Sequence, residues 1–404
     1  MQASFYYISQ GKLFSFADGK TKEIHSGVLN SYISKVRDTA QRNEWKYTGT
    51  GAEFIGTKRE GASPEDAVSA VRSAIHCFGE HAGDIIYSIS IDETNGIYRK
   101  SSDEDSAEGI VLCTGSGAYS DFDIRGNLMA ASAAFAGESH IGVLDLTTQN
   151  FTTYTEGNSR DTSPAWAAFD PNKIYFCCMG LPIKEAKDPN YNAPPRSISQ
   201  IVSEMYTAST VVRGPSSICL LDTYLGTLDE ILSDDRYDFT HPQSLGDGSL
   251  YYIRKPYRQN SDKKSSFGCL AEIVLLPFRL LEALFGFLNV FSAKYSGKTL
   301  SKNDVKRRDE KQMYIDGNLI NAEKELRANA KKGDQNPGII PRSWELRRLD
   351  SNGTDTLIKR GVSAFRVNEM TGDILLSNGS HILKLDKTGK EEKIVSAPKV
   401  TFIK

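Results

Sequence analysis

The sequence predicts an all-β protein, a six-bladed β-propeller with helical insertions in its loops. Composition is the first observation: the 404 residues include 18 Tyr, 18 Phe and 33 Gly but only 14 Pro, which favours strands and turns over disorder. A repeated strand-turn pattern is the second. The third is a strand at residues 399–403 that has no partner strands after it and can complete a sheet begun near the N-terminus.

The repeat is WD-like and has a period of about 36 to 40 residues. In four places a strand ends in Leu-Asp and a turn follows: Leu144-Asp145, Leu221-Asp222, Leu349-Asp350 and Leu385-Asp386. An Asp carboxylate there can accept hydrogen bonds from backbone N–H groups two residues on and so fix the turn. Two apolar strands precede each Leu-Asp pair. Four short strands separated by turns and then repeated are typical of a propeller blade.

Six blades are expected within one domain, residues 1–404. Their bounds are 4–26, 45–113, 118–156, 161–232, 237–359 and 361–396. The first blade is one strand short, and strand 399–403 supplies it. Closing the ring between the two chain ends would remove the free sheet edge that an open array exposes.

Two segments carry a resemblance to a known family. Ser163-Pro164-Ala165-Trp166 through Phe176, and His241-Pro242-Gln243 through Tyr252, resemble the blade signature of TolB-type six-bladed propellers. The resemblance implies the fold. TolB itself has an exported N-terminal domain and a periplasmic role, and this sequence shows neither that domain nor a signal peptide, so we do not expect the same role here.

The N-terminus and the cysteines favour a cytoplasmic location. Residues 1–10 have no basic stretch, apolar core or small-residue cleavage site. The six cysteines form no C-x-x-C pair, so free thiols in a reducing compartment are expected rather than a disulfide framework or a zinc site.

Helical spacing interrupts the repeat, and these interruptions are where partners are expected to bind. Helices are predicted over 28–42, 63–79 and 197–209, the last inside an insertion at 181–216 of the fourth blade. The largest insertion, 259–341, falls in the fifth blade, and a second helix is predicted there over 302–332. By propeller geometry, we expect insertions 28–42, 181–216 and 259–341 on one face and helix 63–79 alone on the other.

The apolar stretch 267–291 is too broadly hydrophobic for a helix that lies on one surface. Three coverings are open: the propeller and neighbouring helices, a partner protein or second copy, and an anionic membrane surface met by the basic residues that follow. A full membrane crossing is not expected, since charges and Pro277 interrupt the stretch. The candidate partner- or membrane-binding residues are Leu270, Ile273, Val274, Phe278, Leu281, Leu284, Phe285, Leu288, Arg307 and Arg308.

No catalytic set is evident, and no cofactor is expected. His241 and Gln243 are the candidate metal ligands, because both begin an inner strand near the channel mouth. Some propellers that resemble TolB, the oligogalacturonate lyases, hold a divalent metal with such residues, but the matching blade starts here carry Ser163 and Ser363. A net charge of −2 and a basic run near Arg307 balanced by acidic residues give no reason to expect nucleic-acid binding.

The sequence therefore predicts a non-catalytic cytoplasmic scaffold that binds another protein through a helical platform. A metal-dependent enzyme of the oligogalacturonate-lyase type and a peripheral membrane-associated propeller are the alternatives, and self-association is a further form of partner binding.

Overall fold

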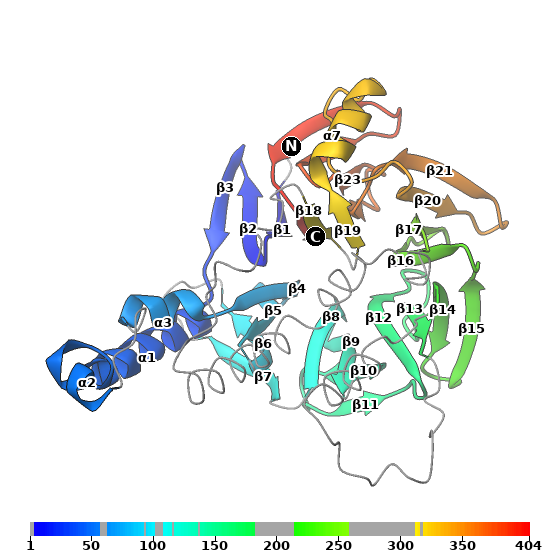
Figure 1. Cartoon of the computed structure of the whole chain (residues 1–404). Coiled ribbons are helices and arrows are strands. Elements are labelled where there is room, and N and C mark those ends of the chain that lie inside the picture. Colours follow the sequence, from blue (N-terminus) through cyan, green and yellow to red (C-terminus); the bar gives the residue numbers. More distant parts are fainter. Residues whose placement is uncertain are drawn as a thin grey trace, which may run out of the picture.

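Strands dominate the structure, and they gather in units of four around a common centre (Figure 1). The computed structural model describes residues 4–56, 63–92, 94–101, 108–114, 117–135, 138–181, 214–257, 312–315 and 318–404. Within these residues there are six antiparallel four-stranded units and one separate two-stranded hairpin. Short strands of alternating burial, each followed by a turn, form the units because one side of every strand must be covered by a neighbouring unit.

The first three units run from the N-terminus to residue 153. The first contains β1 (Phe5–Ser9), β2 (Lys12–Ala17), β3 (Lys20–Ile24) and β26 (Val400–Ile403). The second contains β4 (Ser73–His81), β5 (Asp84–Ile91), β6 (Thr94–Lys100) and β7 (Gly109–Thr114). The third contains β8 (Gly117–Arg125), β9 (Leu128–Phe135), β10 (Glu138–Asp145) and β11 (Phe151–Thr153).

The other three units complete the circle. The fourth contains β12 (Ser159–Trp166), β13 (Lys173–Gly180), β14 (Ser216–Asp222) and β15 (Thr227–Leu232). The fifth contains β16 (Tyr237–Ser244), β17 (Leu250–Pro256), β20 (Glu345–Leu349) and β21 (Asp355–Arg360). The sixth contains β22 (Ala364–Val367), β23 (Ile374–Ser377), β24 (His381–Leu385) and β25 (Glu391–Ser396). One parallel bridge, Ser139 to Arg160, joins the third and fourth units into a continuous eight-stranded sheet.

Strands from the two ends of the chain pair with each other. β26 runs antiparallel to β1, with Tyr7 opposite Ile403 and Ser9 opposite Val400. Val400 and Ile403 are almost completely buried, in a cluster that also contains Phe5 and Ile382. The first unit thus takes its innermost strand from residues 400–403, and β1 is not left as an open edge.

Apolar clusters fill the spaces between neighbouring units. Tyr251 and Ile253 of the fifth unit pack against Phe365 and Val367 of the sixth. Between the second and third units the fully buried Cys77 Sγ donates to the Phe122 carbonyl at 3.2 Å, and Phe122 N donates to Sγ at 3.5 Å. Burial raises the pKa of the Cys77 thiol, so it stays protonated.

Helix α1 (Gly27–Asn43) covers the segment 28–42, where the sequence predicted a helix, and joins β3 to the second unit. Ser26 caps it, because its Oγ accepts a hydrogen bond from Leu29 N at 3.1 Å. The buried carboxylate of Glu108 accepts a second one from Val28 N at 3.0 Å and one from Tyr87 OH at 2.6 Å. A negative group at this position also complements the helix dipole, so the start of α1 is fastened to the second unit.

The helix predicted over 63–79 begins where the sequence placed it, with Ser63 as its cap and Pro64 in its first turn, but it ends at Ala70. The start of the second blade at residue 45 is wrong. A short turn η1 (Glu44–Lys46) and helices α2 (Gly49–Ile55) and α3 (Pro64–Ala70) precede the unit, and α3 ends before β4. The strand was mistaken for helix because a bulge between Ile75 and Cys77 breaks its alternation of buried and exposed side chains. Nor does this helix stand alone: α3 packs against α1, and Arg37 Nε lies 3.2 Å from Glu65 Oε1.

The predicted helix over 302–332 is also corrected. Its described part is a hairpin of β18 (Gln312–Ile315) and β19 (Asn318–Asn321), followed by α7 (Ala322–Lys331). Ile315 and Ile320 pack with Ile339, Ile340 and Trp344, and Ile340 N donates to the Asn378 carbonyl of the sixth unit. This end of the 259–341 insertion is therefore part hairpin and is packed onto the body of the protein. Predicted helices 197–209 and 267–291 lie outside the described residues.

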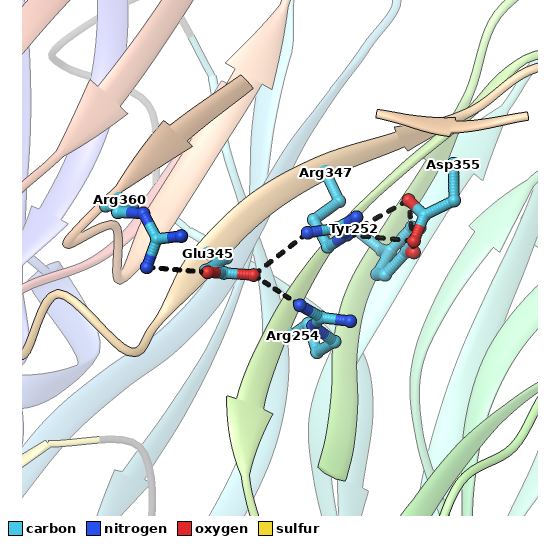
Figure 2. Close-up of polar contacts among 6 residues, drawn as sticks. All are labelled: Tyr252, Arg254, Glu345, Arg347, Asp355 and Arg360. Carbon is cyan, nitrogen blue, oxygen red and sulfur yellow. Dashed lines mark hydrogen bonds and ion pairs between the residues drawn. The ribbon is translucent and has the colours of Figure 1, made fainter. Parts of the chain in front are cut away.

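The fifth unit carries an ion-pair network across the strands that flank this insertion (Figure 2). Glu345 Oε2 accepts hydrogen bonds from Arg254 at 2.6 Å and from Arg347 at 3.0 Å, while Oε1 lies 2.9 Å from Arg360 Nη1. Arg254 and Arg360 are the cross-strand neighbours of Glu345 on β17 and β21. The network therefore fixes the register of three strands, two of which are separated by the whole insertion.

Two further groups extend the network. Arg347 Nε donates to both oxygens of Asp355, at 3.0 and 2.9 Å, and Tyr252 OH donates to the same carboxylate at 2.8 Å. Burial raises the pKa of Glu345, but the hydrogen bonds from Arg254 and Arg347 outweigh it, so the pKa lies below its usual value.

We expect Ile403→Ala to lower the free energy of unfolding by about 2–5 kcal/mol, because it leaves a cavity where β26 joins β1. Thr401→Ala, on the same strand but exposed, should change it by less than about 0.5 kcal/mol. Urea unfolding at equilibrium measures both. If Ile403→Ala and Thr401→Ala both changed the free energy of unfolding by less than about 0.5 kcal/mol, the pairing of β26 with β1 would contribute little to stability.

We expect Glu345→Gln to cost on the order of 3 kcal/mol at pH 7, since three guanidinium groups lose their shared carboxylate. Because the folded-state pKa is depressed, this stabilisation is complete above the ordinary value of about 4.3 and is lost as the pH falls through the folded-state pKa. The difference between wild type and variant should therefore shrink from pH 7 to pH 3 in urea titrations. A difference that is constant with pH would contradict the ionised network.

Candidate functional site

A cavity of about 970 Å³ lies at the centre of the six units. Residues from the innermost strand of every unit line it, including Ala74–His76 of β4, Ser120–Asp123 of β8 and Thr401–Ile403 of β26. It is the natural place to look for a binding or catalytic site, because large concave sites with convergent polar groups hold most ligands.

Three inner strands have the same backbone corner at the cavity. Ser163, His241 and Lys399 have φ of 51°, 55° and 50°. A buried residue follows each of them: Pro164, Pro242 or Val400. The ladders of β12 and β16 shift register just after the corner. The Ser-Pro and His-Pro pairs that the sequence singled out are thus structural bends, repeated from unit to unit.

Gln243 does not have a free ligand atom. Its Nε2 donates to the Val367 carbonyl at 3.0 Å, and its Oε1 accepts from Val367 N at 2.9 Å. Both ends of the amide therefore join β16 to β22 of the next unit. A metal ion at Oε1 would share that oxygen with the Val367 hydrogen bond, which fixes the orientation of the amide.

His241 lines the same cavity, and within the described residues its Nδ1 is buried without a hydrogen-bond partner. No group of three or more His, Cys, Asp or Glu side chains in the described part of the chain is arranged to hold a metal ion. The structure thus places His241 and Gln243 at the cavity, as the sequence predicted, but it does not surround them with further ligands.

Asp123 is the most heavily used charged group of the cavity. Its Oδ1 lies 2.9 Å from Lys404 Nζ, and its Oδ2 accepts from Trp166 N at 3.0 Å. Burial raises the pKa of this carboxyl, but Lys404 and the other donors lower it further, so the net pKa lies below its usual value. Asp123 is therefore held ionised and fully hydrogen-bonded, which suits a structural role better than a general acid.

A second ion pair also lines the cavity. Lys384 Nζ is 2.8 Å from Asp373 Oδ2, and this contact lowers the pKa of Asp373 and raises that of Lys384. Arg366 also lines the cavity. Asp123, Arg366, Lys384 and Lys404 are not among the residues predicted from the sequence. Nothing in their local sequence marks them, since strand pairing alone brings them together.

The candidate partner- and membrane-binding residues between Leu270 and Leu288, together with Arg307 and Arg308, lie outside the described residues. Among the helices that the structure describes, none is both long and apolar enough to cross a bilayer.

Neither a protein-family model nor a curated protein matches this chain. Solved structures do, at low identity. TolB from Acinetobacter baumannii is 10% identical with a TM-score of 0.46, and the match covers 99% of this chain and 65% of TolB. The tricorn protease is 11% identical with a TM-score of 0.41, covering 99% and 34%. Oligogalacturonate lyase from Vibrio parahaemolyticus is 11% identical with a TM-score of 0.35, covering 81% and 80%.

TolB, the family that the sequence resembles, is thus among the structures to which the chain is similar. The chain spans just under two thirds of the length of that TolB. We take no function from these proteins, because the identities are near 10% and the TM-scores are below 0.5.

We expect Gln243→Ala to lower the free energy of unfolding by about 2 kcal/mol, because two hydrogen bonds to a buried backbone are lost. Gln243→Glu keeps an acceptor but cannot donate to the Val367 carbonyl, so it should also destabilise. Gln41→Ala, on the exposed side of α1, is the control, with an effect within about 0.5 kcal/mol. Loss of bound metal without loss of stability would instead make Gln243 a ligand.

Proposed function

We propose that the chain is a single six-bladed β-propeller, spanning residues 1–404 and closed between its two ends, that acts as a non-catalytic scaffold for another protein. The six four-stranded units and the pairing of β26 with β1 support the architecture. In this proposal the segments 181–216 and 259–341 are insertions into the fourth and fifth blades.

The hydrogen bonding of polar side chains in the cavity supports the proposal that the protein is not a catalyst. Gln243, Asp123 and Asp373 each spend their hydrogen-bonding capacity on the protein itself. General acid–base catalysis needs a group within reach of the reactant and with a pKa near the working pH, whereas Asp123 and Asp373 have lowered pKa values. Polar side chains that are hydrogen-bonded within the protein in this way stabilise the packing of the six units against one another.

Exposed aromatic side chains favour binding through the helical segments. Trp45, in η1, is 66% exposed and Phe54, in α2, is 94% exposed, on the helical arm between the first and second units. A partner protein that covers such side chains would remove apolar surface from water. In the proposal this arm and the apolar stretch 267–291 form the platform.

A deletion tests the scaffold. Residues 262–308 are replaced by a short Gly/Ser linker, and the packed hairpin and α7 from residue 312 onward are kept. The variant should keep its melting temperature but lose the protein that the full chain captures by cross-linking in cells. Flotation with anionic and neutral liposomes separates a membrane surface from a protein partner. A variant that aggregates, or that captures the same protein, contradicts the platform.

A metal-dependent enzyme acting in the channel is the second candidate, favoured by the buried and unpartnered Nδ1 of His241. His241→Gly is the variant of choice, because glycine adopts the positive φ at this corner without strain and only the imidazole is lost. A stoichiometric transition metal in the wild type that disappears in His241→Gly, by elemental analysis, would establish this candidate in place of the scaffold.

A further inference from the structure

Arg366 differs from every other residue of its strand. In β22, Ala364, Phe365 and Val367 are buried, and Arg366 alone is exposed, into the central cavity. Among the described residues its guanidinium makes no hydrogen bond and no ion pair. A guanidinium has five N–H donors in a planar fork and is always charged, so one that lines a cavity unpaired is prepared for an acceptor.

The other charges at this end of the cavity already have partners. Lys404 is paired with Asp123 at 2.9 Å and Lys384 with Asp373 at 2.8 Å. Glu369 accepts a hydrogen bond from Gly246 N at 2.6 Å. Each of the two ion pairs is close to neutral. Arg366 acts on Asp123 through its charge, but among the described residues of the cavity it is the cation that makes no direct hydrogen bond or ion pair.

Apolar surface adjoins Arg366. Arg366, Leu375 and Lys384 are successive cross-strand neighbours on β22, β23 and β24, and therefore share one face of the sixth unit. Leu375 packs with the cluster that contains Phe5, and both residues line the cavity. The site thus offers a cationic fork beside an apolar wall shared by the first and sixth units.

We propose that Arg366 binds a carboxylate that is carried by an apolar group, with the apolar part against Leu375 and Phe5. A carboxylate matches the guanidinium fork with two parallel hydrogen bonds. A phosphate or another multiply charged anion fits less well, because Glu369 lines the same cavity without a cationic partner among the described residues and would repel the second charge. The site is separate from the helical arm and does not depend on the proposed platform.

Such a carboxylate has two sources, the C-terminus of a peptide and a small carboxylic acid. Three probes distinguish them: the tripeptide acetyl-Gly-Ala-Phe with a free carboxylate, the same peptide as its C-terminal amide, and 3-phenylpropanoate. Binding is measured by calorimetry and by the fluorescence of Trp166, which lines the cavity. Trp45 lies on the helical arm and Trp344 in the separate cluster around α7.

The free-acid peptide should bind, and its amide should bind about 10- to 100-fold more weakly. Arg366→Ala should weaken the acid by the same factor, and Arg366→Lys, which keeps the charge but not the fork, by less. Arg42→Ala, which removes an exposed charge on α1, is the charge-matched control and should change nothing. Melting temperatures of all variants verify folding.

Phenylpropanoate binding as tightly as the peptide would identify a small acid as the source, and tighter peptide binding would identify a C-terminus; both support the site. Three results overturn the proposal: no binding of either acid to the wild type, equal affinity for acid and amide, or undiminished affinity of a folded Arg366→Lys and Arg366→Ala pair.

Discussion

The pairing of β26 with β1 is the contact on which the rest of the molecule depends. Each unit covers the apolar face of the next, and the pairing of the last strand with the first completes the first unit so that it can pack against both of its neighbours. The same pairing brings Lys404 to Asp123 and keeps Phe5 close to Leu375. The shape of the cavity, its charge balance and its apolar wall therefore all follow from a ladder of a few residues.

The order of strands in the fifth unit explains why a long connection can join β17 to β20. β17 and β20 are neighbours in the sheet, so whatever lies between them leaves and re-enters at adjacent strand ends. The ion-pair network around Glu345 then holds the register that a long connection cannot specify. Local charge complementarity here does what a short turn does between β16 and β17 of the same unit, where only residues 245–249 separate the strands.

The sequence was sufficient for the strands but not for their irregularities. The Leu-Asp turns and the segments from Ser163 and His241 locate strands that the structure contains, and Val28, Leu29 and Tyr32 predict α1 by their spacing. Helix α3 begins at the predicted cap, but the bulge after Ile75 gives β4 a spacing of buried residues that imitates a helix, so the prediction extends the helix into the strand. A bulge depends on how a strand pairs with its neighbour, and the spacing of apolar residues within one segment does not predict it.

The site was predictable only in part, for a related reason. His241 and Gln243 were placed correctly at the cavity, since both flank a recognisable corner. The role of Gln243 depends on Val367, which is 124 positions away in the chain. Arg366 looks like any charged residue of a short strand whose other side chains are apolar. That it faces an enclosed space rather than open solvent depends on the first unit, whose inner strand comes from the other end of the sequence.

The rate at which Cys77 is alkylated measures how often the second and third units separate. The thiolate is the form that reacts with alkylating reagents, and this thiol is enclosed, protonated and bonded to the backbone of Phe122. Its labelling therefore has to wait for the second and third units to separate, while the exposed Cys113 reacts from the native state. The ratio of the Cys77 labelling rate to the Cys113 labelling rate therefore gives the fraction of time that the second and third units are separated under native conditions.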